Sequence, residues 1–116
     1  MGLIDDESFA REWVRQRHVR RGKSARALNL ELKEKGVASE DRAAALEQVT
    51  EDSEEAIARH IAAKKARTLK SVPEDRHERD KFLRRIVGTL ARRGYNQSLT
   101  MRVSIEALDA RIAELS

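Results

Sequence analysis

A chain of 116 residues is long enough for one ordinary domain or two very small ones, and its composition argues against one large core, because 38% of the residues are charged and only 3% are aromatic. The formal net charge of +4 bears on solubility more than on fold, and the absence of cysteine excludes disulfides and thiolate metal sites and fits a reducing compartment. No apolar run approaches the roughly 18 residues of a membrane span and no targeting segment is recognised, so we expect a cytoplasmic protein without membrane contact.

The apolar residues of the first half recur at helical spacing, which predicts amphipathic helices. The first helix should begin at Asp5 or Asp6, where a carboxylate can cap free N–H groups, and should end near residues 21–22. Its apolar face comprises Phe9, Ala10, Trp13 and Val14, with Arg11, Arg15 and His18 on the opposite, solvated side.

Two shorter helices should follow in the first half. One is expected over residues 23–35, with Gly36 supplying the left-handed residue after its end, and the next should start at Ser39. The side chains assigned to their buried faces are Ala25, Leu28, Leu32, Leu46 and Val49.

The second half predicts three more helices. The fourth should start near residues 52–53, the fifth should hold Pro73 in its first turn and stop at residues 93–94, and the sixth should be capped by Asn96 or Ser98. The residues assigned to the core are Ile57, Ala58, Ile61, Ala62, Phe82, Leu83, Ile86, Val87 and Leu90, with a stripe of Met101, Ile105, Leu108, Ile112 and Leu115 on the last helix.

The two halves match each other, which predicts three-helix domains at residues 1–50 and 51–116. Residues 32–37 match residues 90–95, and the second copy is longer in the stretch 68–76 between its first two helices. Such modules would bury faces against each other and form an elongated, curved array of tandem repeats. The alternative is the chance self-similarity of any helical protein. The alignment pairs Leu46 with Ile105 and Val49 with Leu108.

Catalytic constellations are absent from the sequence. His18, His60 and His77 lack metal-ligand spacing and are interpreted as solvated side chains. The acids lie among Arg and Lys at helical spacing, which is typical of ion-paired faces. We therefore expect a monomeric binding protein without cofactor or metal, and not an enzyme.

Stripes of basic residues are the remaining functional signal. As a set they suit nucleic-acid phosphates or an acidic protein groove, although each could simply be solvated. Trp13, Phe9 and Tyr95 are assigned to the core, which leaves little for base stacking. Arg17 and Lys65 fall on the apolar sides of their helices, where a long stem can cover the core. The candidate contact residues are Arg11, Arg15, Arg20, Arg21, Lys23, Arg26, Lys33, Lys64, Lys65, Lys81, Arg85, Arg92 and Arg93.

Several short motifs in this order resemble the RecX family of bacterial regulators of the RecA recombinase. They are residues 3–11, 21–23 and 32–37 in the first half, and residues 63–65, 82–85 and 90–95 in the second. The resemblance implies tandem three-helix repeats, usually three, of which this sequence is expected to begin at the second. It also implies binding in the groove of the RecA–DNA filament and inhibition of recombinase and coprotease activity.

The residues and the resemblance together predict a regulator that binds the RecA filament and inhibits it without chemistry. Contact with single- or double-stranded DNA would be through the backbone. One alternative is a nonspecific DNA-binding helical protein that recognises phosphates, and another is a helical scaffold with no nucleic-acid role.

Overall fold

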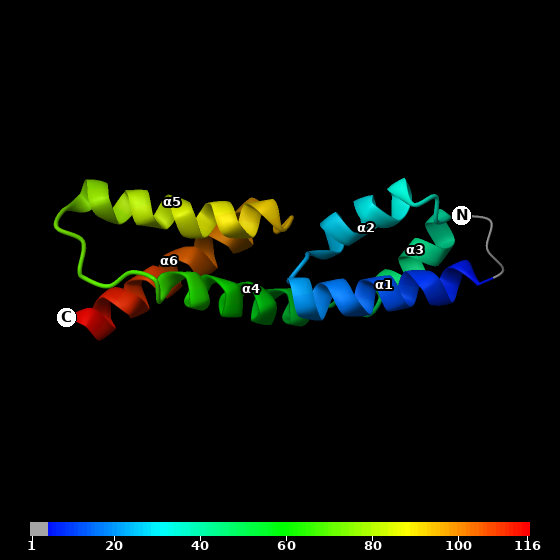
Figure 1. The fold of residues 1–116 in the computed structure, drawn as a ribbon, viewed down its shortest axis with the longest axis horizontal. Coiled ribbons are helices and arrows are strands. Elements are labelled where there is room, and N and C mark those ends of the chain that lie inside the picture. The colour runs from blue at the N-terminus through cyan, green and yellow to red at the C-terminus, as the bar shows by residue number, and fades with distance from the viewer. Residues whose placement is uncertain (1–4) are drawn as a thin grey trace. The chain divides into compact units, whose positions relative to one another are not determined.

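The computed structural model describes residues 5–116, and this range is helical apart from its turns and connections, which confirms the predicted all-α repeat fold. Leu3 and Ile4, which open the first family-like motif, lie outside the described residues. The chain divides into two compact units, unit 1 (Met1–Glu54) and unit 2 (Glu55–Ser116). The helices, drawn in Figure 1, are α1 (Asp6–Arg21), α2 (Ala25–Glu34), α3 (Ser39–Leu46), α4 (Glu51–Ala66), α5 (Arg76–Arg92) and α6 (Gln97–Leu115).

The ends of α1 follow from side chain–backbone bonds that the sequence predicts. The Asp5 carboxylate accepts a hydrogen bond from the Ser8 N–H at 3.2 Å, which satisfies one of the free donors of the first turn. At the other end Gly22 adopts a left-handed conformation with φ of 65°, and the Lys23 N–H donates to the Arg17 carbonyl at 3.2 Å. The chain reverses within three residues, because Ser24 already caps α2 through the Ala27 N–H at 3.1 Å.

The core of unit 1 is small and aliphatic. Its buried residues come from all three helices and from the turn after α2, and Trp13 lies half-buried at its margin instead of inside it. His18 is only 5% exposed, so its assignment to the solvated side of α1 was wrong. His18 follows Ala10 and Val14 at helical spacing on the buried face. The buried apolar set is Ala10, Val14, Leu28, Leu32, Val37 and Ala45.

Unit 2 begins its second helix later than the sequence predicts. Pro73 lies outside α5, because Asp75 caps the helix by accepting a hydrogen bond from the Glu78 N–H at 2.9 Å. Asn96 caps α6 through the Leu99 N–H at 2.8 Å, which resolves the choice between Asn96 and Ser98.

The buried face of α6 also differs from the predicted stripe. Leu108 is fully buried, but Ile105 is 36% exposed and Met101 is only half-buried. The core instead receives Thr100, Val103 and Ser104, one step around the helix, because these smaller side chains let α6 pack closely. The buried apolar set of unit 2 is Ala58, Ile61, Ala62, Ala66, Phe82, Ile86, Leu90, Tyr95, Val103 and Leu108.

Candidate filament and nucleic-acid binding surfaces

The basic residues predicted on the first half of α1 are already paired with acids on the same helix. Arg11 lies 2.8 Å from the Glu7 carboxylate and Arg15 lies 2.6 Å from that of Glu12. Hydrogen bonds from Gln16 and then Arg15 lower the pKa of Glu12 below its usual value, so this carboxylate stays ionised. A polyanion would have to compete with these acids for both arginines.

Lys23 and Arg17 meet at one acid of α2. The Lys23 ammonium lies 2.5 Å and the Arg17 guanidinium 3.8 Å from the Glu31 carboxylate. The Trp13 indole N–H donates to the same carboxylate at 2.9 Å, and Arg17 Cζ lies 3.3 Å from the centre of the Trp13 ring. Arg17 thus covers the apolar side of α1 by cation–π stacking, which agrees with its predicted position. This cluster joins α1 to α2, so Lys23 serves the fold of unit 1 first.

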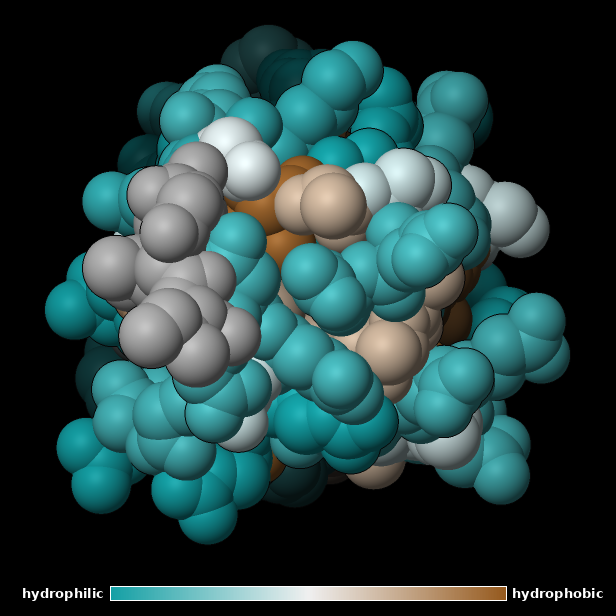
Figure 2. Space-filling view, turned by 90° about the vertical axis from the view of Figure 1, so that its right-hand side faces the viewer, coloured by the Kyte–Doolittle hydropathy of each residue, from teal (hydrophilic) through white to brown (hydrophobic). Residues whose placement is uncertain are grey.

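Other predicted cations of unit 1 are exposed and make no ion pair among the described residues. Arg20 and Arg21 end α1, while Arg26 and Lys33 share the outer face of α2 with Leu30, which is 52% exposed. Figure 2, seen from the end at which α1 begins, shows a mainly hydrophilic surface with a small hydrophobic area near its middle. That face therefore favours polar over extensive apolar recognition.

Unit 2 carries a continuous row of cations along α5. Lys81, Arg85 and Arg92 recur with Gly88 at spacings that place all four positions on one helical face, called here the α5 strip. The three cations are exposed and make no ion pair within the described chain. From Lys81 to Arg92 the strip is about 16 Å long at 1.5 Å per residue.

Gly88 leaves the middle of the α5 strip without a side chain. A Cβ there would lie 3.1 Å from Arg92 Nη1, so glycine lets the Arg92 guanidinium fold back along the helix. Glycine inside a helix costs about 1 kcal/mol relative to alanine, and here the space it leaves is taken by the Arg92 guanidinium.

The other predicted cations of unit 2 divide by exposure. Lys64 is exposed, whereas Lys65 and Arg93 are half-buried at the ends of their helices. Sequence reasoning missed Arg84, which is exposed beside the α5 strip, and Arg67 and Lys70 in the connection after α4. Helical spacing on α5 was the signal that could have identified Arg84.

A second group of arginines in unit 2 joins α4, α5 and α6 to one another. Arg59 pairs with Glu55 and Glu106, Arg102 pairs with Glu55, and Arg79 lies 2.8 Å from the Asp109 carboxylate. The hydrogen bond from Arg102 lowers the pKa of Glu55 below its usual value. These cations are neutralised within the fold, which separates them from the α5 strip.

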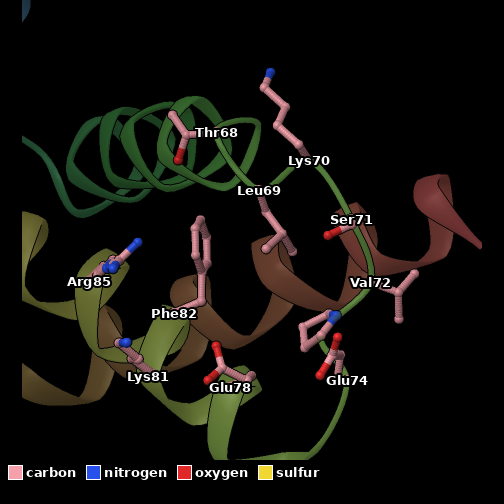
Figure 3. A pocket seen from close by; sticks show the side chains of 11 residues that line it. Thr68, Leu69, Lys70, Ser71, Val72, Glu74, Glu78, Lys81, Phe82 and Arg85 are labelled. Carbon is pink, nitrogen blue, oxygen red and sulfur yellow. The ribbon is translucent and has the colours of Figure 1, made fainter.

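Between the connection after α4 and the first half of α5 lies a pocket of about 460 Å³. In Figure 3 the side chains of Leu69 and Phe82 point into it, Lys81 and Arg85 lie at one side, and Glu74 lies at the other. The described residues contain no cluster of three or more histidines and acids suited to a metal ion. No described helix is both long and apolar enough to cross a bilayer.

Sequence comparison relates the chain to known proteins over nearly its full length. Residues 5–46 match the family described as "RecX, second three-helix domain". A protein of Corynebacterium efficiens named "Regulatory protein RecX" is 55% identical over 97% of this chain and 54% of its own length. The chain belongs to the RecX family.

Other RecX proteins give the same result. The one from Mycolicibacterium vanbaalenii is 44% identical over 89% of this chain and 56% of its own length. The one from Streptomyces coelicolor is 41% identical over 94% of this chain and 55% of its own length. The chain thus spans about half the length of these relatives. No solved structure matches it significantly.

Proposed function

We propose that this chain binds the RecA–DNA filament and restrains the recombinase by contact alone. The similarity to proteins named regulatory protein RecX supports the class of function, and the α5 strip supports the mode of binding. A bound protein that favours one arrangement of filament subunits shifts the population toward that arrangement and needs no catalytic group.

The α5 strip is the observation that carries this proposal. Duplex DNA presents one negative charge per about 1.7 Å of axis, so a strip about 16 Å long can face several phosphates at once. Its three cations would not have to leave an acid to do so, in contrast to Arg11 and Arg15. We also propose the remaining exposed cations as weaker contacts, with Arg26 and Lys33 as the contact face of α2.

Contacts from both units would act together if the chain lies along the filament. Linking two weak sites makes the second binding event intramolecular, which raises the overall affinity without any new contact. The domains proposed for residues 1–50 and 51–116 would each supply one such site. Loss of either basic face should therefore weaken binding more than its own few contacts suggest.

The test is charge reversal on α5. We expect Lys81→Glu with Arg85→Glu to weaken binding to RecA filaments on single-stranded DNA, and to reduce the slope of log affinity against log salt by about one for each lost phosphate contact. Arg11→Glu with Arg15→Glu should weaken binding less, because both arginines are already paired. Binding and ATPase inhibition would be measured at several salt concentrations.

Arg76→Glu is the control for a single charge reversal on the same helix but outside the α5 strip, with a side chain that is 93% exposed. Circular dichroism would verify that all variants fold. Unchanged binding by the α5 variant would refute the proposed surface. Equal binding of the parent protein to DNA with and without RecA would favour the alternative function, a helical protein that contacts the phosphate backbone nonspecifically.

A further inference from the structure

The pocket of unit 2 combines features that the binding of a polyanion does not require. Its wall on one side is the connection between α4 and α5, and its floor includes Leu69 and Phe82. Phe82 is only 7% exposed, whereas Val72 on the rim is 43% exposed. Its volume of about 460 Å³ lies within the range of ligand sites, roughly 300–1,000 Å³.

The connection is held in place at both ends. The Leu69 N–H donates to the Ala66 carbonyl at 3.0 Å, and Arg111 of α6 donates from Nε to the Leu69 carbonyl at 3.0 Å. At the far end Asp75 is fixed as the cap of α5. The pocket wall is therefore formed before any ligand arrives, which lowers the entropic cost of binding.

Between these anchors the backbone is unpaired. Within the described chain, the N–H groups of residues 70, 71, 72 and 74 and the carbonyls of residues 70–74 make no hydrogen bond. These free N–H and C=O groups can hydrogen-bond a ligand that carries both donors and acceptors, as a peptide backbone does. A ligand that is itself a peptide is thus matched to the wall.

The charges around the pocket are polarised. Lys81 and Arg85 are exposed at one side and make no ion pair within the described residues, while Glu74 and Glu78 border the same pocket. A continuous run of phosphates would meet both acids, whereas a peptide can place one carboxylate at the cations and an apolar side chain against Leu69 and Phe82.

We propose that this pocket docks a short extended peptide segment of a partner protein, with an acidic residue next to a large apolar one. The carboxylate pairs with Lys81 and Arg85, the apolar side chain fills the space over Leu69 and Phe82, and the peptide backbone pairs with residues 70–74. This site shares Lys81 and Arg85 with the α5 strip, but it adds the apolar pair Leu69 and Phe82 and the backbone of the connection, which phosphate binding does not use.

The experiment is an amide NMR titration of the whole chain with the acetylated, amidated peptide Glu-Asp-Phe-Leu-Asp-Glu. We expect the amides of Leu69, Val72, Phe82 and Arg85 to show saturable chemical-shift changes. The amides of unit 1 should not shift. The peptide with serine in place of Phe and Leu, and the peptide with lysine in place of its acids, should each bind at least about tenfold more weakly.

Two variants test the site itself. Val72→Glu places a negative charge on the exposed rim, where it repels the acidic peptide. It should weaken peptide binding about tenfold without unfolding unit 2. Lys81→Ala with Arg85→Ala should do the same, whereas Arg76→Ala should leave the affinity unchanged. Absence of shifts at millimolar peptide, or shifts elsewhere, overturns the proposal. It is also overturned if oligothymidylate shifts the amides of Leu69 and Val72, which lie outside the α5 strip, more strongly than the peptide does.

Discussion

Units 1 and 2 join their first two helices in different ways. In unit 1 only residues 22–24 separate α1 from α2, whereas residues 67–75 separate α4 from α5 in unit 2. The two units also differ in the last buried residue of their first helices, α1 and α4. It is His18 in unit 1 and Ala66 in unit 2, and each follows a fully buried alanine, Ala10 or Ala58, at the same helical spacing.

His18 is the polar link that holds the short turn. Its Nδ1 lies 2.8 Å from the Lys23 carbonyl oxygen, and because a carbonyl can only accept, Nδ1 carries the proton. Its Nε2 lies 3.1 Å from Ser53 Oγ at the start of α4. One buried ring thereby joins the α1–α2 turn to the last residues of unit 1.

The longer connection of unit 2 needs no such ring. Ala66 ends the buried face, Leu69 packs against the core, and Arg111 fixes the Leu69 carbonyl from α6. The extra residues leave space for the pocket beside α5. The three-helix unit thus has a closed turn in one half and an open recess in the other, and this difference in shape follows from the connection more than from the helices.

The largest effect is expected from core truncation at equivalent positions. Leu32 and Leu90 are both fully buried, four residues before the left-handed glycines Gly36 and Gly94. Each change to alanine should destabilise its own unit by about 2–5 kcal/mol. Native-state amide hydrogen exchange would report the two units separately. Equal loss of protection in both units from either variant would contradict two independently stabilised cores.

Removal of the polar link should destabilise unit 1 by less. His18→Ala leaves the part-buried Lys23 carbonyl without its ring donor, and we expect a loss of about 1–3 kcal/mol of unfolding free energy, together with faster exchange around the α1–α2 turn. His60→Ala is the control, because His60 is exposed and should change stability by less than about 0.5 kcal/mol. Unchanged exchange at the turn in the His18 variant would show that Gly22 and Ser24 suffice to close it.

Sequence patterns predicted the local parts of this fold well. Asp5, Gly22 and Asn96 were placed at helix ends because capping is a contact between near neighbours, and Ser39 was correctly placed at the start of α3 although no side chain caps that helix. The burial of His18 was missed although it follows Ala10 and Val14 at helical spacing, because its polar ring was taken to be solvated; its partner Ser53 is 35 positions away in the sequence. The contact with Ser53 is set by the packing of whole helices, so the partner that satisfies the ring could not be read from the local pattern.

The candidate site likewise divides into features set by neighbouring residues, which were predictable, and features set by contacts distant in sequence, which were not. Helical spacing placed Lys81, Arg85 and Arg92 on one face of α5. The pairing of Arg11 with Glu7 was also predictable from the sequence, because the two residues are four positions apart on one helix. The pocket was not predictable, since it depends on how the connection after α4 passes α5, and on the Arg111–Leu69 bond between segments distant in sequence.

Two buried serines should respond to the same change with opposite signs. The Ser24 hydroxyl in unit 1 accepts from the Ala27 N–H at 3.1 Å, so Ser24→Ala should cost about 1 kcal/mol. The Ser104 hydroxyl in unit 2 is buried without a hydrogen-bond partner, so Ser104→Ala should stabilise by up to about 1 kcal/mol. Thermal unfolding of both variants would test the pair. A loss of stability in Ser104→Ala would mean that its hydroxyl is satisfied in solution.

The smallest effect should be a difference in acid sensitivity between the units. The pKa of Glu12 is lowered by Gln16 and Arg15 on its own helix, whereas the pKa of Glu55 is lowered by Arg102 on another helix. A lowered pKa in the folded state means that each carboxylate stabilises the fold above the ordinary glutamate pKa, and that this contribution is lost as the pH falls through the folded value. Both groups are exposed, so the contributions are small and salt should reduce them.

Loss of the Glu55 pairing should loosen the contact of α4 with α6, whereas loss of the Glu12 pairing affects α1 alone. We therefore expect amide exchange in unit 2 to accelerate more than in unit 1 as the pH falls through this window, after correction for intrinsic rates. Glu55→Gln should remove most of that difference, and Glu12→Gln should leave it in place. Carboxyl NMR titration would supply the two pKa values directly. The comparison fails if both glutamates titrate at the ordinary value, or if the Glu12 variant alone abolishes the difference between the units.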